Sequence, residues 1–562
     1  MILESLSLSN FRCFGAEETA ITFKEDVTSF IGGNGAGKTA ALVALSRLFG
    51  VSNSQRSIRK SDFHITSDED SLPDESRLFI DAVFAFPELD AVPDDEDDTV
   101  VAPAVAEFWR QMSASDDGET LKVRIRLAAT WTDDGTPDGS TEEEIKWVPR
   151  LDEAYDWDAC AKVSATDRSA VQMIYVPAMR RPDEQVKSLL SSRLWKAAHW
   201  SDALKKTVTE SAAGVQEALA GEAPISFILD RLTKRWSQVH LADTETEPMF
   251  RLIEDKFENL IRQTEMRFRP DEAGMERELS RLSDGQKSLF HIALTAATLE
   301  VERDALALST DEAPFDQAKL KQVPLTILAI EEPENSLSPF FLSRIIDLAM
   351  DVGVMPTAQV LIASHSPSIM SRIEPESVRY FRLDSASASA SVRALTLPQG
   401  DEEAQSYVRL AVKAYPELYF ARFVVLAEGD SEQLVLPRLA KAFGLALDKS
   451  FVPIVPLGGR YVGHFWRLLT DLDIPYATLL DLDLGRRTGG ADRIRNIVAE
   501  LSDIGKHMHD THAYNVDETI DVDALDDLEG SDFQLDYDQD CLDGDKWIEA
   551  LLEHDVYFSK PI

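Results

Sequence analysis

The sequence predicts an α/β fold built from two successive units, and three observations support this. A glycine-rich loop at 32–39 follows an apolar run and opens into a helical pattern. Two later apolar runs, at 325–330 and 360–363, have the uninterrupted character of buried parallel strands. A strand-and-helix pattern then starts again near residue 422. Because 562 residues exceed what one hydrophobic core usually supports, we expect several domains.

Composition limits the compartment and the partners. The three cysteines, Cys13, Cys160 and Cys541, lie far apart and suit a reduced, cytoplasmic location. No apolar segment reaches membrane-spanning length, so we expect no membrane partner. The formal charge of −42 repels DNA at long range, so a DNA contact requires bound cations or a local basic face. Basic residues at 180–206 and 234–269 are candidates for that face, and ordinary solvated helix surfaces are the alternative.

The glycine-rich loop is predicted to bind a nucleotide triphosphate. Its residues fit the G-x-x-x-x-G-K-[ST] spacing between a strand and a helix. Glycines let backbone N–H groups converge on phosphates, and the helix N-terminus adds a favourable dipole. We expect Lys38 to contact the β- and γ-phosphates and Thr39 to ligate Mg²⁺. The predicted nucleotide-binding residues here are Gly32, Asn34, Gly35, Gly37, Lys38 and Thr39.

Three later stretches carry chemistry that suits the same site. Ser283, Gly285 and Gln286 precede an apolar helix and predict a second anion site, with an ordinary helix cap as the alternative. The buried strand at 325–330 ends in Glu331 and Glu332, which are placed for Mg²⁺ and for polarising a water. The strand at 360–363 ends near His365, which can hydrogen-bond a γ-phosphate.

Together these motifs resemble the ATP-binding-cassette (ABC) ATPases of the SMC and RecF type. The resemblance implies a Walker A loop at 32–39, a signature loop at 283–286, a Walker B strand ending at Glu331 and a D-loop near 336–339. It also implies that Glu332 is catalytic and that His365 is the switch histidine. Glu331 departs from the aspartate that many of these ATPases carry. The family sandwiches ATP between two heads, so a homodimer or higher oligomer is implied.

The second unit is expected to carry a metal site. Strands at 423–427, 452–457 and 477–480 end in glycine or carboxylate residues, which gathers acidic groups along one sheet edge. Strand alternation predicts that Asp481 and Asp483 share a face that Glu428 can reach. Carboxylates this close repel one another unless a hard divalent cation lies among them. Acidic turns that end ordinary strands are the alternative.

This second constellation resembles a TOPRIM domain, with Glu428 as its glutamate and Asp481 and Asp483 as its D-x-D pair. An ABC ATPase joined to a Rossmann-like TOPRIM domain is similar to the OLD (overcoming lysogenization defect) family of nucleases. That family includes the nuclease subunit of the Gabija anti-phage system. The resemblance implies hydrolysis of DNA phosphodiesters with one or two Mg²⁺, or with Mn²⁺ or Ca²⁺ at this site. Glu428, Glu432, Asp481 and Asp483 would hold the ions.

The expected domains follow from the order of the motifs. Residues 1–180 and 281–400 form the two parts of the ATPase, and 181–280 form a helical insertion that either dimerises or supplies core helices. Residues 420–562 form the TOPRIM domain. The chain stops within a strand-like stretch near Lys560, so the last part of the nuclease site would be missing or would come from a partner protein.

The predicted function is therefore an ATP-regulated, metal-dependent DNA endonuclease in anti-phage defence. It would use ATP and Mg²⁺, and its partners would be DNA, a second copy of the chain and a defence-system protein. The alternative is a RecF-like DNA-binding ATPase with a TOPRIM domain that has lost its chemistry.

Overall fold

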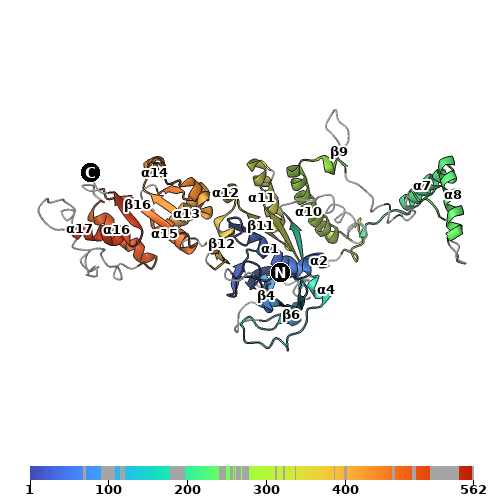
Figure 1. The fold of residues 1–562 in the computed structure, drawn as a ribbon, viewed down its shortest axis with the longest axis horizontal. Helices are drawn as coiled ribbons and strands as arrows, with labels where there is room; N and C mark the ends of the chain where they lie inside the picture. Colours follow the sequence, from blue (N-terminus) through green and yellow to red (C-terminus); the bar gives the residue numbers. More distant parts are fainter. Residues whose placement is uncertain are drawn as a thin grey trace. The chain divides into compact units, whose positions relative to one another are not determined.

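A computed structural model shows an α/β protein, with three main β-sheets among the residues that it describes, which confirms the α/β class (Figure 1). It describes residues 1–66, 71–89, 108–113, 121–177, 197–239, 248–252, 257, 260, 267–268, 277–309, 313–320, 323–335, 337–384, 387–395, 397, 402–457, 462–483, 489–506 and 543–559. Two compact units are formed, one from 1–175, 324–334 and 338–562, and the other from 176–323 and 335–337. Among the helices in these ranges, none has the length and apolar character needed to cross a membrane.

The first sheet is antiparallel and packs its apolar side chains against the N-terminal helix. Its strand order is β2-β1-β4-β5-β6. The strands are β1 (Ile2–Ser9), β2 (Thr19–Thr22), β4 (Glu75–Ala85), β5 (Lys122–Thr132) and β6 (Ser140–Val148). Leu6, Leu8, Ile80 and Leu127 are fully buried and share one core with Leu42 and Leu45 of α1 (Lys38–Phe49). The short helix α2 (Asn53–Arg56) follows α1 in the sequence, and the short helix α4 (Ala165–Arg168) follows β6.

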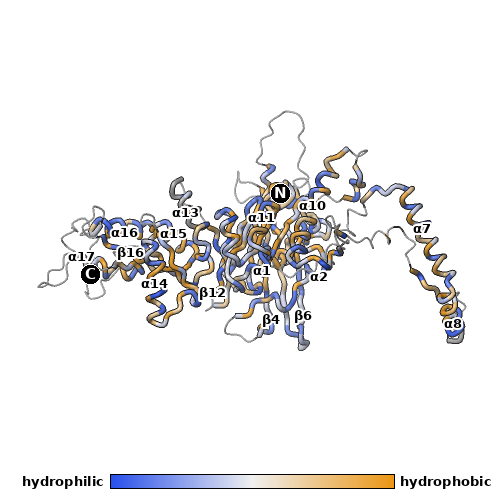
Figure 2. Tube along the Cα trace, turned by 90° about the horizontal axis from the view of Figure 1, so that it is seen from above, coloured by the Kyte–Doolittle hydropathy of each residue, from blue (hydrophilic) through white to orange (hydrophobic). Residues whose placement is uncertain are grey.

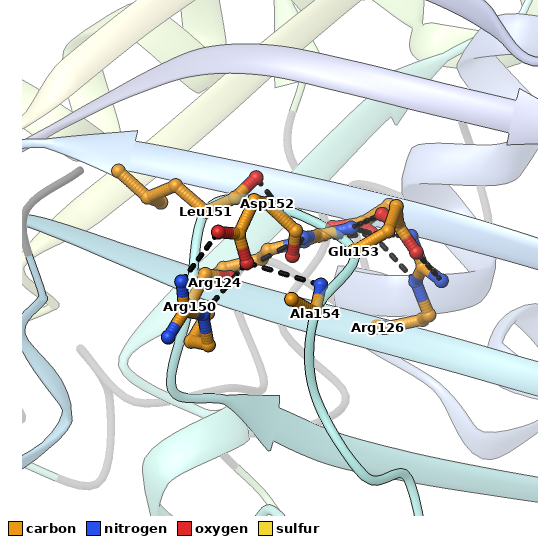
Figure 3. A network of polar contacts seen from close by, with 8 residues as sticks. Arg124, Arg126, Arg150, Leu151, Asp152, Glu153 and Ala154 are labelled. Carbon is orange, nitrogen blue, oxygen red and sulfur yellow. Dashed lines mark hydrogen bonds and ion pairs between the residues drawn. The ribbon is translucent and has the colours of Figure 1, made fainter.

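A buried ion-pair cluster ties the first sheet to the loop that follows β6 (Figure 3). Asp81 on β4 lies within 2.6 Å of a guanidinium nitrogen of both Arg124 and Arg126 on β5. Glu153 pairs with the same two arginines, at 2.9 Å from Nη2 of Arg126. Arg124 also donates to the backbone carbonyls of 150–152. Buried charges are stable only when paired in this way, so the cluster fixes the loop onto the sheet.

The second sheet positions the phosphate loop, and its strand order is β13-β12-β3-β11-β10-β7. The strands are β3 (Val27–Gly32), β7 (Val171–Val176), β10 (Leu325–Glu331), β11 (Ala358–Ser364), β12 (Val378–Asp384) and β13 (Ser389–Ala394). The order β12-β3-β11-β10 is parallel throughout. Every residue of β3, β10 and β11 is buried, as the apolar runs predicted. Helices α11 (Pro339–Gly353) and α12 (Pro367–Met370) follow β10 and β11.

The third sheet begins the second predicted unit and is fully parallel, with order β15-β14-β16-β17. Its strands are β14 (Val424–Ala427), β15 (Ile454–Pro456), β16 (Tyr476–Asp481) and β17 (Val556–Ser559). Trp466 is fully buried and donates its indole N–H to Thr478 Oγ1 at 2.7 Å, which fixes α15 to this sheet. The helices are α13 (Glu402–Ala414), α14 (Asp430–Ala442), α15 (Val462–Asp471), α16 (Ala491–Asp503) and α17 (Asp543–Leu552).

The compact unit of 176–323 is mainly helical. It holds α7 (Asp202–Ala220), α8 (Ala223–Val239) and α10 (Asp284–Ala307), and α7 and α8 mix hydrophobic and hydrophilic residues along their length (Figure 2). Two short strands, β8 (Arg267–Phe268) and β9 (Arg277–Glu278), pair where the pattern predicted helix, so that part of the prediction is wrong. Strands of two residues are too short to show a period in their side chains. The apolar spacing of the surrounding sequence therefore predicted a helix there. The basic stretch at 180–196 lies outside the described residues.

Seven short 3₁₀ turns complete the described elements. They are η1 (Lys60–Asp62), η2 (Pro87–Leu89), η3 (Trp109–Gln111), η4 (Leu279–Arg281), η5 (Pro375–Ser377), η6 (Pro416–Phe420) and η7 (Asp448–Ser450).

Candidate functional sites

The glycine-rich loop joins β3 to α1 in the conformation that a phosphate cradle requires. Gly35 and Gly37 have φ angles of 80° and 108°, which L-residues with a side chain rarely adopt. A Cβ on Gly32 would lie 2.2 Å from the carbonyl oxygen of Phe381, so a side chain does not fit there either. Gly37 caps α1 without any side-chain hydrogen bond. No side chain of the cap therefore accepts a hydrogen bond from the first N–H groups of α1, and an anion can do so instead.

Lys38 is buried in this loop and bonds to the loop itself. Its Nζ donates to the carbonyl oxygens of Gly32 and Gly33, both at 2.7 Å. Burial lowers the pKa of Lys38, and the carboxylates of Glu332, Glu334 and Glu331 act in the opposite direction. The ammonium is thus held beside the loop by two neutral acceptors, which a phosphate can replace with charge-assisted bonds.

The carboxylate at the end of β10 lies against the hydroxyl that follows Lys38. Thr39 Oγ1 donates to Glu331 Oε1, and the phenol of Tyr175 donates to Glu331 Oε2. Burial, and then the hydrogen bond to Glu331, raise the pKa of the Tyr175 phenol well above its usual range. The phenol therefore stays protonated and keeps donating. Hydroxyl and carboxylate oxygens are ligands that Mg²⁺ prefers, so Thr39 and Glu331 fit such an ion.

Glu332 and His365 meet beside this pair. His365 Nδ1 lies 3.2 Å from Glu332 Oε1 and 3.6 Å from Glu334 Oε1. Glu334 accepts from Ser364 Oγ at 2.7 Å and from the backbone N–H of His365 at 3.2 Å. Glu332 has a φ of 45°, the left-handed conformation. The turn after β10 thus aims Glu332 at the histidine that follows β11, where the two can act on one bound group.

A cavity of about 240 Å³ lies between the glycine-rich loop and the carboxylates at the end of β10. Its lining includes the loop from Asn34 to Thr39, Glu331 and Glu332. Arg12 and Cys13 line it as well. Arg12 bonds the buried carboxylate of Asp62 through Nε at 2.9 Å, so its side chain is held at the cavity edge.

The predicted signature residues lie in the other compact unit and form a helix cap. Ser283 Oγ accepts from the N–H of Gln286 at 3.3 Å, and Gln286 Oε1 accepts from the N–H of Ser283 at 3.1 Å. This reciprocal pair is a capping box at the start of α10, within which Gly285 is buried. The predicted D-loop includes Ser336, which lies outside the described residues.

The second candidate site lies at the carboxyl ends of β14 and β16. Glu428 follows β14 directly and accepts the backbone N–H of Asp481 at 2.6 Å through Oε2. Arg493 on α16 approaches the same Oε2, with Nη2 at 3.3 Å. Both side chains are mostly covered, at 20% and 17% exposed. The side chains of Glu428 and Arg493 thus meet beside the backbone of Asp481 at one sheet edge, and sequence reasoning did not include the arginine.

Two predicted ligands are placed differently from expectation. Asp483 has a φ of 50°, so the strand ends at Asp481 and the alternation that would align the two aspartates does not continue. Glu432 accepts from the N–H of Gly429 at 3.0 Å and from Ser431 Oγ, which makes it a capping residue of α14. Within the described ranges, no group of three acidic, histidine or cysteine side chains is preassembled to hold a metal. Lys560 lies outside these ranges.

Comparisons with known proteins assign a domain to each site. Residues 419–483 match the model described as "Overcoming lysogenization defect protein-like, TOPRIM domain". Residues 1–100 match "AAA ATPase domain", and residues 130–371 match "AAA domain, putative AbiEii toxin, Type IV TA system". These matches confirm the predicted order of an ATPase domain followed by a TOPRIM domain of the OLD type.

One curated relative and two solved structures are also similar. Endonuclease GajA of Bacillus cereus (strain VD045) is 27% identical over 208 residues, which cover 37% of this chain and 34% of GajA. The matched part thus spans about a third of that relative. The SMC head domain from Thermotoga maritima is 14% identical, with a TM-score of 0.30 and coverage of 71% of this chain and 100% of that one. The C-terminal region of the Xanthomonas campestris pv. campestris OLD protein is 22% identical, with a TM-score of 0.17 and coverage of 26% and 53%.

Proposed function

We propose that this chain, which joins an AAA-type ATPase domain to an OLD-like TOPRIM domain and is distantly related to endonuclease GajA, is an ATP-regulated, metal-dependent DNA endonuclease. The observation that carries the nuclease assignment is the meeting of Glu428 and Asp481 at the ends of adjacent parallel strands. In this proposal the enzyme acts in the cytoplasm in anti-phage defence and assembles through its ATPase domains.

The donor set of the C-terminal site suits a hard divalent cation. Carboxylate oxygens are the preferred ligands of Mg²⁺ and Mn²⁺, and Glu428 and Asp481 supply them from neighbouring strands. A bound cation would supply a metal-activated water and a Lewis acid for phosphodiester hydrolysis. Asp483 follows within two residues, and a change in its left-handed turn would bring it to the same cation. Glu432 joins this site only if it leaves its capping position.

The chain's own residues hold the ATP site in the same proposal. Lys38 exchanges its two carbonyl partners for the β- and γ-phosphates, and Thr39 with Glu331 holds Mg²⁺. Glu332 accepts a proton from the attacking water, and His365 stays beside it near the γ-phosphate. Ser283, Gly285 and Gln286 bind the nucleotide of a second copy in a head-to-head dimer. Gly32, Asn34, Gly35 and Gly37 shape the loop.

Plasmid nicking tests the nuclease assignment. Supercoiled DNA is incubated with Mg²⁺ or Mn²⁺ and the parent, Glu428→Ala or Asp481→Ala. We expect the parent to nick the plasmid and both variants to lose at least about 100-fold in rate, because each removes a direct metal ligand. Glu417→Ala, which changes a carboxylate in η6 before the strand, is the matched control and should nick normally. No nicking by the parent would favour the RecF-like DNA-binding ATPase instead.

ATP binding and turnover test the other site separately. Lys38→Ala should abolish nucleotide binding, because the loop then lacks its phosphate-contacting cation. Glu332→Gln should bind ATP and hydrolyse it at least about 100-fold more slowly, because an amide cannot accept the proton. Fluorescent-nucleotide binding and phosphate release measure the two effects. Normal hydrolysis by Glu332→Gln would show that another group is the base.

A further inference from the structure

We infer that Arg493 is the residue of this chain that contacts the scissile DNA phosphate, and that it pairs with Glu428 until a divalent cation takes that carboxylate. This inference rests on the proposed nuclease function and names a substrate contact within the same site. The argument uses three features of Arg493: its position on α16, its unsatisfied donors and the distance of its ion pair.

Gly489 and Gly490, which precede α16, fix the position of Arg493. The N–H of Gly490 donates to the carbonyl oxygen of Leu482 at 2.8 Å, and a Cβ on Gly489 would lie 1.9 Å from the carbonyl oxygen of Asp483. Only glycine allows this close approach. As a result, α16 begins directly beside the carboxylates, and Arg493 lies in its first turn.

The donors of Arg493 are buried and incompletely satisfied. Nε and Nη2 have no hydrogen-bond acceptor among the residues that the structure describes. Nη2 lies 3.3 Å from Oε2 of Glu428 and forms an ion pair with it, but it donates no hydrogen bond to that oxygen. Leaving buried guanidinium donors unpaired is costly, so an anionic acceptor would be stabilised there. The planar fork of arginine matches two oxygens of a phosphate.

Glu428 cannot serve the guanidinium and a cation equally well. Its Oε2 already accepts the N–H of Asp481 and faces Arg493. A divalent cation bound by Glu428 and Asp481 would repel the guanidinium and compete for the same oxygen. A phosphate oxygen that the cation attracts would then be a new acceptor for Arg493, in addition to the carboxylate of Glu500, with which Arg493 already interacts electrostatically. The same residue would thus neutralise the empty carboxylate site and later bind the substrate.

Two measurements on the full-length chain test this. In the first, Mn²⁺ alone is titrated and followed by electron paramagnetic resonance, without DNA. Arg493→Gln should bind Mn²⁺ at least about threefold more tightly than the parent, because a competing positive charge is removed. Arg495→Gln is the matched control, since Arg495 lies on the same helix and pairs with Asp492 at 3.0 Å. It should bind Mn²⁺ like the parent.

In the second measurement, cleavage is followed at saturating Mn²⁺. Arg493→Gln should cleave about 10- to 100-fold more slowly, the effect of losing one charge-assisted hydrogen bond, although it binds the metal better. Arg493→Lys keeps the charge and should recover part of the rate. A purely structural role of Arg493 would instead lower metal binding and cleavage together.

The outcomes separate this inference from the proposed function. A parent that neither binds Mn²⁺ nor cleaves DNA overturns the proposed function itself. A parent that does both, with Arg493→Gln equal to it in either measurement, overturns only the role of Arg493. If Arg493→Gln fails to fold by circular dichroism, Arg493→Lys decides through the cleavage measurement, because a cleavage rate equal to that of the parent would contradict the inference.

Discussion

Tyr175 shows what a single side chain adds to the ATP site. It is the last but one residue of β7, and its phenol donates to the carboxylate that also accepts from Thr39. A ligand whose orientation is fixed by such an outer partner binds its metal more tightly. We therefore regard Tyr175 as a positioning residue for Glu331.

Tyr175→Phe should raise the Mg²⁺ concentration needed for half-maximal ATP hydrolysis by about tenfold or more. The substitution removes only the phenolic oxygen, so nucleotide binding without Mg²⁺ should stay unchanged. Phosphate release across a Mg²⁺ titration measures the effect. Tyr419→Phe is the control, because Tyr419 is buried and its phenol has no hydrogen-bond partner among the described residues. An unchanged Mg²⁺ requirement in Tyr175→Phe would remove its positioning role.

Residues near one another in sequence could be predicted, and residues joined only by the fold could not. The loop from Gly32 to Thr39 is contiguous, so its spacing alone predicts its shape. Tyr175 meets Glu331 only because β7 lies beside β10, and Arg493 meets Glu428 only because α16 returns to β14. No motif in the sequence around Tyr175 or Arg493 indicates these contacts. The sequence predicts Asp483 beside Asp481 only if strand alternation continues for two residues past the end of β16, and it does not.

At the scale of elements, the first sheet depends on the charges between β4 and β5. Asp81 is the central acceptor of the cluster, and its partners Arg124 and Arg126 are 5% and 10% exposed. The hydropathy of the two strands does not indicate that a buried aspartate holds two arginines in register. The pairing depends on which residues face each other across the strands, which only the register reveals.

Asp81→Asn should lower the free energy of unfolding by about 3–5 kcal/mol, because two buried arginines lose their shared counter-charge. Urea unfolding followed by tryptophan fluorescence measures the change, since Trp131 and Trp147 lie in the same sheet. Asp152→Asn is the control, because Asp152 forms an exposed pair with Arg150 and its loss should change stability little. Equal stability of Asp81→Asn and the parent would mean that Glu153 alone neutralises both arginines.

Helix α16 contains a carboxylate that opposes folding at neutral pH. Burial raises the pKa of Glu500, and the N–H of Gly463 and the charge of Arg493 only partly offset this. At a pH below its pKa in the unfolded chain, Glu500 is protonated in the folded and the unfolded protein and does not lower the free energy of unfolding. As the pH rises through the raised pKa of the folded state, the charged form is disfavoured by burial and stability is lost.

Glu500→Gln should therefore be more stable than the parent at pH 7, by at most about 1 kcal/mol after solvent screening, and should lose this advantage near pH 4. Thermal unfolding at the two pH values measures the difference. Asp492→Asn is the control, because Asp492 is exposed on the same helix and has no burial cost to remove. A constant difference between Glu500→Gln and the parent at both pH values would contradict the assignment.

At the scale of the whole molecule, net charge bears on the proposed binding of DNA. The chain carries 99 acidic and 57 basic side chains, and its C-terminal site is itself acidic. The sequence predicts this repulsion directly, because net charge needs no fold. It does not predict where the repulsion is relieved, since that depends on which carboxylates the sheet brings together.

We expect DNA binding to require a divalent cation. Bound cations convert the carboxylate edge at Glu428 and Asp481 into a site that a phosphate can enter, whereas in EDTA the field of the protein repels the duplex. Fluorescence anisotropy of a labelled duplex measures binding in Ca²⁺ and in EDTA, and we expect at least about tenfold weaker binding in EDTA. Glu428→Ala should lose most of the gain from Ca²⁺, while Lys38→Ala without ATP should keep it. Equally tight binding in EDTA would show instead that a basic face elsewhere on the chain holds the DNA, and the acidic edge would then have no part in capturing it.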